Sequence, residues 1–584
     1  MSTDHFTAFD IETDDADKLY QLPANSPEYI RLMGVGDQTV PGPFTACGIR
    51  LFPATCTVNG NLFDFPALDR HYGLPVERTI PFSRDLRTAA FQHDPPTTYQ
   101  TSPGPGYRSY SMSALAARYL GEPEAKSDAL KALARLHGGY GSIPLDDPEY
   151  HAYLRQDLDV TQRLSAAIPW HPYEQREAYV ATVTARTTLN GFQADVPALT
   201  ARVDVLREQA RQGRDRLADE YGFPLTNGAG KPAAAPQRTK AGKEAFAAAL
   251  TDAGVDLTYW PRNRDGSLAL GKDVLSAAAE GLAGHPALPL VQAVQAMNGI
   301  RTSAANLLSH VNTHDGRAYY TFEPYQSTGR WSCGLTVLKK GVADSERMFL
   351  TADGEENDPD ADVLVSVDLD QIDIRAVAVH AQDPALIALL NDPERDIHSE
   401  IAAMARVPRK PAKTVDLGWL YGRGVKGMAE NTPGVTLEAA IAVAQYMGSA
   451  FPSVRPWQDR VRDQGAAGVL LDNGFGRRLR VDPQRAYTQA PAMMGQSTTR
   501  DIIAEGLLDL ARTAPEMLPM LRVIVHDEVV ASVPRRHAEE CARVLQSCLS
   551  RQWAPAGASI PVNITAGQGS PFKFCYRWGD LYMD

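Results

Sequence analysis

Four short segments in the C-terminal half of the chain constrain the fold more than any bulk property. Two of them carry cations, and the other two place a carboxylate after an apolar run. In chain order they are STGRWS at 327–332, VSVDLDQIDIR at 365–375, RKPAKTVDLGWLYG at 409–422 and VIVHDEVV at 523–530. A charge inside an apolar β pattern needs a partner or a metal ion. The set is therefore suited to holding a triphosphate and two metal ions.

Composition indicates a globular protein with several domains. The chain has 584 residues, of which 44% are hydrophobic and 22% are charged. This length is enough for about three to five domains or subdomains. The formal net charge of −12 would by itself argue against a nucleic-acid-binding protein. Binding needs only local basicity, however, and residues 406–426 contain six basic residues and one acid.

Neither a membrane segment nor a disulfide framework is indicated. No run of about 18 apolar residues occurs, and the N-terminal MSTDHFTAFDIET lacks a basic region followed by an apolar stretch. The six cysteines are scattered and form no CxxC pair; they are at 47, 56, 333, 541, 548 and 575. We expect a reduced, cytoplasmic protein without a zinc knuckle.

Carboxylates follow an apolar strand near the N-terminus. FTAFDIET predicts a strand in which Asp10 and Glu12 share one face, because side chains alternate with a period of two. Asp64 ends a second apolar segment, and Tyr153 and Asp157 lie at i and i+4 on a predicted helix. The DxE pair alone would also fit a solvated strand end. Two carboxylates on one face repel each other unless a cation neutralises them, so the full set points to a metal site.

The order and spacing of these residues resemble the DEDDy class of 3′-5′ exonucleases, specifically the proofreading domain of family A DNA polymerases. In-line hydrolysis of a phosphodiester uses two divalent ions about 3.5–4 Å apart, held by hard oxygen ligands. The resemblance implies that four acids hold two Mg²⁺ ions, with Mn²⁺ as an alternative: Asp10, Glu12, Asp64 and Asp157. It also implies that Tyr153 orients the attacking water and that Asn59 contacts or positions the substrate.

The segment RKPAKTVDLGWLYG predicts a helix with one mixed basic and apolar stripe. The members of this stripe recur every four residues and are Arg409, Lys413, Leu417 and Tyr421. Pro411 is tolerated only if the helix has just begun. A basic face of this kind is commonly just solvated. A helix N-terminus that carries Arg and Lys is also a triphosphate site, because the helix dipole and the fixed cations act together.

The C-terminal segments resemble the motifs of family A DNA polymerases. VSVDLDQIDIR and VIVHDEVV match the family's A and C motifs, whose aspartates, here Asp368 and Asp527, bridge two Mg²⁺ ions. One ion would lower the pKa of the primer 3′-hydroxyl, and the other would neutralise the leaving pyrophosphate. The helix resembles the family's RxxxKxxxFxxxYG, which implies phosphate contacts by Arg409 and Lys413, with Lys413 as general acid. Further nucleotide contacts implied by the resemblance are Leu417, Tyr421, His398, Gln371 and Asp373.

The same resemblance implies a set of DNA contacts. STGRWS matches TxTGRxS, in which the arginine, here Arg330, reaches the minor-groove side of the primer terminus. Gln496 and Arg485 are implied to contact the template-primer backbone. His526 and Glu528, which flank Asp527, are implied to lie beside the primer.

The chain departs from the family pattern near the nucleotide. Asp373 stands where the family usually has a glutamate that excludes a ribose hydroxyl, and Leu417 stands where it has Phe or Tyr. Asp370 replaces Ser, Asp416 replaces Asn, and LTVLKKG replaces LQNIP after TGRWS. These differences concern substrate discrimination and leave the reaction class unchanged.

The resemblance implies an α/β and α+β multidomain protein, with a ribonuclease H-like exonuclease domain followed by a right-hand polymerase of the compact bacteriophage type. The expected ranges are exonuclease 1–170, thumb and connecting helices 171–310, palm 311–383, fingers 384–470 and palm again 471–584. The expected partners are primer-template DNA and dNTPs, bound by a monomer in the bacterial host cytoplasm. Two Mg²⁺ ions are expected at each active site.

Two other functions stay open as rivals: an exonuclease whose C-terminal half only grips DNA, and a non-catalytic DNA-binding scaffold. Intact Asp368, Lys413 and Asp527 argue against the first, and the full set of acidic ligands argues against the second. The segment 224–243 is rich in Gly, Ala and Pro, with basic residues and no acid. It is either a surface loop or a tip that binds a phosphate backbone.

Overall fold

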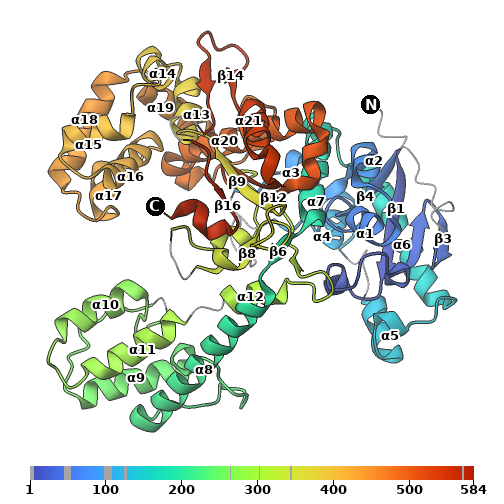
Figure 1. Cartoon of the computed structure of the whole chain (residues 1–584), viewed down its shortest axis with the longest axis horizontal. Coiled ribbons are helices and arrows are strands. Elements are labelled where there is room, and N and C mark those ends of the chain that lie inside the picture. Colours follow the sequence, from blue (N-terminus) through green and yellow to red (C-terminus); the bar gives the residue numbers. More distant parts are fainter. Residues whose placement is uncertain are drawn as a thin grey trace. The chain divides into compact units, whose positions relative to one another are not determined.

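The structure is a computed structural model, and the chain divides into two compact units (Figure 1). Unit 1 consists of Met1–Gln193 and Asn312–Asp584, and unit 2 consists of Ala194–Val311. The described residues are 6–44, 54–97, 108–123, 128–263, 265–300, 303–341, 345–567 and 571–583, so that Cys47 lies outside them. Across these ranges, no helix combines the length and the apolar character needed to cross a bilayer.

A five-stranded mixed sheet forms the centre of the N-terminal part of unit 1 (Figure 1). Its strand order is β3 (Gln38–Pro41), β2 (Ile30–Val35), β1 (Thr7–Thr13), β4 (Thr55–Thr57) and β5 (Ser83–Asp85). β1 pairs antiparallel with β2 and parallel with β4. The side chains of β1 alternate, so Ala8 joins one apolar cluster while Phe9 and Ile11 join another. Both faces of the sheet are therefore buried under other elements.

Helices cover this sheet and bring in the remaining predicted site residues. They are α1 (Asp64–Tyr72), α2 (Val76–Thr79), α3 (Leu86–His93), α4 (Met112–Tyr119), α5 (Ala129–His137) and α6 (Pro148–Ala167). α6 begins after Asp147, whose carboxylate accepts hydrogen bonds from two backbone N–H groups of the first turn. It then packs against β1, β2, β3 and β4. In this way α6 carries Tyr153 and Asp157 to the sheet.

Helix α7 (Tyr173–Asn190) follows the N-terminal part and stops at Gly191, where a positive φ of 63° favours glycine. It packs against α20 (Ala486–Thr513) and β12 (Leu521–Val525). α7 begins the range 171–310 that we expected for the thumb and connecting helices, and it belongs to unit 1. A buried network of charges joins α7 to α20; it comprises Arg176, Glu177, Arg477, Arg500 and Asp501.

Unit 2 is helical and has its own apolar core. It comprises α8 (Val196–Tyr221), α9 (Lys240–Asp252), α10 (Lys272–Gly281), α11 (Leu288–Gly299) and α12 (Ser303–Ser309). Asp195 caps α8 and Gly222 ends it in the left-handed conformation. In the segment 224–243, the Gln237 side chain is buried and donates to Asn298 on α11 at 3.0 Å. This segment is therefore anchored to the unit near its C-terminal end.

A four-stranded antiparallel sheet carries the C-terminal carboxylates. Its strand order is β12, β13 (Glu528–Pro534), β9 (Asp362–Asp368) and β16 (Phe574–Cys575). Helix α21 (Ala538–Leu549) packs against β9 and β13, and α20 packs against α21. Most of β9 and all of β12 are buried, and their sequences are accordingly mostly apolar.

The aromatic segment 317–325 contains only a short strand. Only Arg317–Ala318 form a strand, β7, which pairs with β6 (Phe192–Ala194). The aromatic residues after β7 are buried as single side chains outside a regular ladder: Tyr319, Tyr320, Phe322 and Tyr325. The apolar pattern after β7 therefore indicates buried side chains and not strand pairing.

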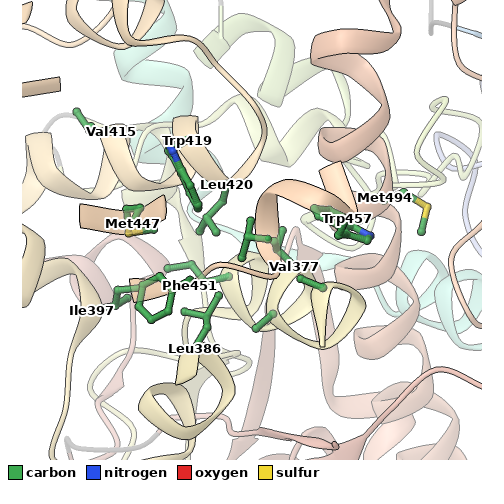
Figure 2. Close-up of a cluster of buried hydrophobic side chains, with 14 of the residues drawn as sticks. Val377, Leu386, Ile397, Val415, Trp419, Leu420, Met447, Phe451, Trp457 and Met494 are labelled. Atoms are coloured by element: carbon green, nitrogen blue, oxygen red, sulfur yellow. The ribbon is translucent and has the colours of Figure 1, made fainter. Parts of the chain in front are cut away.

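Helices that follow β9 share one apolar core, part of which Figure 2 shows. They are α13 (Ile372–Ala381), α14 (Pro384–Asn391), α15 (Ile397–Ala405), α16 (Arg409–Leu420), α17 (Val425–Glu430), α18 (Leu437–Ala450) and α19 (Val454–Ala466). α16 buries Trp419 and Leu420 in this core, beside Met447 of α18. Arg409 and Lys413 of the same helix stay exposed. The structure thus confirms the predicted helix and its start just before Pro411.

Candidate active sites

The first site is a carboxylate cluster on the N-terminal sheet. Asp10 and Glu12 lie in β1, Asp157 lies on α6, and one ligand atom from each lies within 4.8 Å of the others. Carboxylate oxygens are the ligands that Mg²⁺ and Mn²⁺ prefer, so this donor set fits a divalent ion. The cluster arises because period-two alternation puts Asp10 and Glu12 on the face that α6 covers.

Asp64 adds a fourth carboxylate to this region. It is the first residue of α1 and is 3% exposed. Burial, followed by the negative charges of Asp10, Asp85 and Glu12, raises the pKa of Asp64 well above its usual range. Such a concentration of negative charge is unfavourable in the absence of a cation, and a bound cation would relieve it.

A cleft of about 540 Å³ borders the cluster. Its lining includes Glu12, Phe63, Lys131, Tyr140 and Tyr153. Tyr153 lies one turn before Asp157 on α6, as the sequence predicted for a residue beside the metal ligands. Asn59 precedes α1 in a left-handed conformation, and its side-chain oxygen accepts a hydrogen bond from Arg87. The cleft is therefore acidic at the cluster and has aromatic walls.

The second site lies at the ends of β9 and of the β12–β13 hairpin. Asp368 is the last residue of β9 and pairs with Glu528 in the antiparallel ladder. His526 and Asp527 form the two-residue turn of the hairpin, with His526 at a φ of 57°. The Leu369 N–H donates to the Asp527 carbonyl oxygen at 3.0 Å. Two segments that are distant in sequence thus bring the predicted aspartates side by side.

The two aspartates destabilise each other's charged forms. Desolvation, followed by the charges of Asp527 and Glu528, raises the pKa of Asp368 to about 7. Desolvation and the charge of Asp373 raise the pKa of Asp527. Lys340 opposes both shifts. Hard oxygen donors with raised pKa values fit a site for divalent cations.

A cleft of about 750 Å³ connects these carboxylates to helix α16. Asp368 and Asp527 line this cleft together with Arg409, Lys413 and Leu417. The other sequence-predicted nucleotide contacts in the lining are Gln371, Asp373 and His398. Folding therefore assembles most of the predicted nucleotide site in one cavity.

Two of the predicted contacts are engaged with partners in this structure. Arg409 pairs with Asp396 at 2.8 Å, and Gln371 donates to the same carboxylate at 3.0 Å. Although partial burial opposes ionisation, the hydrogen bonds from Arg409 and Ser399 outweigh it and lower the pKa of Asp396 to about 2. A ligand that accepts from the Nε and Nη2 donors of Arg409 would displace Asp396.

Asp373, at the position expected to exclude a ribose hydroxyl, accepts hydrogen bonds from two side chains. Arg330 donates to Asp373 Oδ1 at 3.0 Å, and the Thr499 hydroxyl donates to the same oxygen at 3.1 Å. Nearby, the Tyr421 ring packs against Gly495 of α20, where an added Cβ would lie 2.7 Å from Tyr421 Cε1. The glycine therefore permits the close approach of the ring.

The predicted DNA contacts differ in accessibility. Arg485 and His526 are exposed, and Arg330 and Gln496 are partly exposed. Glu528 is 1% exposed and accepts hydrogen bonds from Ser366 and Tyr582. It also pairs with Lys340 at 2.6 Å. Glu528 therefore supports the hairpin from within.

Sequence reasoning missed Lys340 and Asp396. Lys340 belongs to LTVLKKG, the segment that departs from the family pattern after TGRWS. That departure is the sequence signal that could have drawn attention to Lys340. Asp396 precedes His398 in DIHSEIA, and the structure makes it the N-cap of α15. No sequence signal pairs Asp396 with Arg409, because the two residues belong to different helices.

The carboxylates of Asp368 and Asp527 and the exposed cations of helix α16 line one cleft, an arrangement suited to a nucleotide-polymerising enzyme. The model of DNA polymerase family A matches residues 255–573, and the chain belongs to this family. The chain is 26% identical over 548 residues to the DNA polymerase of Mycobacterium phage D29, covering 89% of this chain and 83% of that protein. It is 25% identical over 541 residues to the DNA polymerase of Mycobacterium phage L5, with the same two coverages.

The fold is also similar to a solved structure. The POL domain of Pol1 from M. smegmatis, in complex with DNA primer-template and dNTP, superposes with a TM-score of 0.65 at 19% sequence identity. The match covers 99% of this chain and 97% of that chain. At this level of identity the likeness shows the fold. The multidomain polymerase fold expected from the sequence is thereby confirmed.

Proposed function

We propose that this family A DNA polymerase joins dNTPs to a primer 3′ end in the 750 Å³ cleft. The observation that carries the proposal is that Asp368, Asp527, Arg409 and Lys413 line a single cavity. Template-directed DNA synthesis is the activity of the family, and the geometry supports this cleft as its site.

Asp368 and Asp527 would hold divalent ions, with Mg²⁺ or Mn²⁺ suited to their carboxylate oxygens. When bound, such ions lower the pKa of the primer 3′-hydroxyl and neutralise charge on the leaving pyrophosphate. The raised pKa values of both aspartates support this role, since a cation would relieve their repulsion. Lys340 and Glu528 would keep the hairpin in place while the ions bind.

The helix α16 would bind the triphosphate. Arg409 would exchange Asp396 for phosphate oxygens, and exposed Lys413, one turn further along, would donate a proton to pyrophosphate. Leu417 and Tyr421 follow on the same stripe and would flank the new base pair. Gln371 would be released when Arg409 gives up Asp396, because both donate to that carboxylate.

Arg330 would reach the primer terminus after release from Asp373, the pair that now holds it. Gln496, Arg485 and His526 would contact the DNA backbone around it, consistent with their partial or full exposure. Asp373 would face the sugar of the incoming nucleotide.

We further propose that the N-terminal site removes nucleotides from the primer 3′ end. Asp10, Glu12, Asp64 and Asp157 would hold the metal ions, and Tyr153 would orient the attacking water. Support comes from the mutual proximity of Asp10, Glu12 and Asp157, and from the cleft beside Tyr153. Both the excision activity and its metal ligands are proposals.

One assay tests both activities on the unmodified protein. A primer labelled at its 5′ end is annealed to a longer template and incubated with Mg²⁺, with or without the four dNTPs. We expect lengthening with dNTPs and shortening without them. Shortening alone would identify an exonuclease that only grips DNA, and a shift in gel mobility without either reaction would identify a binding scaffold.

A further inference from the structure

A buried histidine-aspartate pair lies behind the nucleotide cleft. His398 on α15 is 2% exposed, and Asp416 on α16 is completely buried. His398 Nδ1 lies 2.5 Å from Asp416 Oδ2, and the other carboxylate oxygen accepts the Leu417 N–H. His398 also lines the 750 Å³ cleft. The pair therefore connects the two helices at the wall of the cavity that holds Arg409 and Lys413.

The hydrogen bond between the two side chains limits what the ring can do elsewhere. A neutral imidazole has a single N–H, and an ionised carboxylate can only accept. If Nδ1 carries the proton that Asp416 accepts, Nε2 has none and cannot donate. Phosphate oxygens of a triphosphate only accept hydrogen bonds as well. Binding of a phosphate oxygen by Nε2 thus requires one more proton in the pair, on the ring or on the carboxyl group.

An asparagine at position 416 would remove this requirement. Its side-chain NH₂ group can donate to Nδ1, which leaves a neutral ring with its single proton on Nε2. The ring could then donate to phosphate without taking up a proton. Asp416 stands at a position where we noted that the family often has Asn. In this chain His398 Nδ1 therefore meets a carboxylate oxygen, which accepts, instead of an amide NH₂ group, which donates.

Resting on the proposed role of this cleft in dNTP binding, we propose that Asp416 is a positioning residue that makes nucleotide binding proton-linked. His398 binds a triphosphate oxygen through Nε2 only when the His398–Asp416 pair has taken up one proton. The proton comes from solvent when the nucleotide binds and returns to solvent when pyrophosphate leaves.

Several charged groups surround the pair and set the pH at which it takes up the proton. From α16 these are Arg409 and Lys413, and at the start of α15 they are Asp396 and Glu400. Helix α18, which packs against α15, carries Glu438 and Tyr446. The other charged residues that line the cleft are Asp368, Asp370, Asp373, Arg375, Asp527, Asp392, Glu394 and Arg395. These groups are the same in wild type and in an Asp416→Asn variant, so the comparison isolates the pair.

The test measures the apparent Kd of a matched dNTP by single-turnover incorporation between pH 6 and pH 9. In wild type, Kd should be constant at low pH and rise about tenfold per pH unit once the pair loses its extra proton, until the contact is lost. In Asp416→Asn, Kd should stay nearly constant. The ratio of the wild-type Kd to the variant Kd should therefore rise with pH. Titration of the nucleotide itself affects both proteins equally and cancels in this ratio.

Calorimetry provides a second readout of the proton. The heat of dNTP binding to the complex of the protein with primer-template is measured above the pH at which the wild-type Kd begins to rise. The measurement is repeated in buffers with different ionisation enthalpies. Wild type should take up close to one proton, and Asp416→Asn should take up almost none. Asp463→Asn, an exposed aspartate on α19, serves as the matched control and should retain the wild-type slope.

The outcomes separate this proposal from the proposed function. A parallel pH profile in Asp416→Asn, with Kd changed by one factor at every pH, would show a merely structural role and overturn the proposal. If Asp416→Asn does not fold, His398→Gln replaces it, and a retained slope in that variant has the same meaning. Failure of wild type to incorporate any dNTP would overturn the proposed function itself.

Discussion

Replacement of Asp501 by Asn should destabilise the junction between α7 and α20. Asp501 is completely buried and accepts hydrogen bonds at 2.6 to 3.0 Å from Tyr173, Arg176, Asn473, Arg477 and Arg500. Burial alone would raise the pKa of Asp501, but the guanidinium groups of Arg477, Arg176 and Arg500 outweigh it and hold that pKa well below its usual range. The carboxylate is therefore the anionic centre of the network.

The substitution keeps the volume of the side chain and removes its charge. The amide NH₂ group of Asn would face donors only, and Glu177 would be left as the buried acid beside Arg477 and Arg500. Removal of one partner from a buried ionic network costs about 3–5 kcal/mol. Total folding free energies are about 5–15 kcal/mol, so this is a large fraction of stability.

The pH dependence follows from the lowered pKa. Stability contributed by Asp501 is fully present above the pKa of an unfolded aspartate, about 3.9, and is lost as pH falls through the lower folded value. The difference between wild type and Asp501→Asn should therefore persist unchanged from pH 8 to pH 5.

Urea unfolding followed by tryptophan fluorescence measures the effect. Asp509→Asn is the matched control, because Asp509 lies on the same helix and makes partly exposed pairs with Arg512 and Arg551. We expect the control to cost below about 1 kcal/mol. An Asp501→Asn variant within about 1 kcal/mol of wild type, or a control that is equally destabilised, would refute the role of the buried network.

Three further predictions concern the polymerase cleft. Leu417→Tyr should improve the use of dideoxynucleotides, because a tyrosine hydroxyl can replace the missing 3′-OH; equal chain termination by both forms would contradict this. Asp373→Ala in an exonuclease-deficient form should raise the rNTP-to-dNTP incorporation ratio by roughly 10 to 200-fold, and an unchanged ratio would place the gate elsewhere. Lys340→Met should lower the Mg²⁺ concentration for half-maximal extension, because it removes a positive charge that repels a bound cation and leaves the charge of Glu528 unpaired. A higher Mg²⁺ requirement would show that the role of Lys340 in holding the hairpin dominates.

Local sequence patterns were sufficient to predict features that depend on a single helix or strand. Pro411 required a helix that begins at about Arg409, and α16 does begin there. Alternation in β1 put Asp10 and Glu12 on one face, and the structure brings both together with Asp157. The apolar runs before Asp368 and Asp527 indicated strands: β9 ends at Asp368, and β12 ends at Val525, two residues before Asp527.

Partners across elements were not predictable in the same way. A periodic pattern determines which face of a helix is buried, and it carries no information about the residue that meets it from another helix. The pairs Arg409–Asp396, His398–Asp416 and Lys340–Glu528 are of this kind. The resemblance to the family suggested that His398 meets phosphate directly, whereas its burial against Asp416 emerges only from packing.

The central claim is that one chain holds two metal-dependent sites with separate ligands. The measurement is primer extension and primer shortening, assayed side by side for Asp527→Ala and for the double variant Asp10→Ala with Glu12→Ala. Asp527→Ala should abolish extension and retain shortening, because it removes one carboxylate of the pair at the β12–β13 hairpin. The double variant should retain extension and lose shortening, because it removes two of the three clustered ligands on the N-terminal sheet. Loss of both activities in either variant, with a circular dichroism spectrum like that of wild type, would contradict the claim.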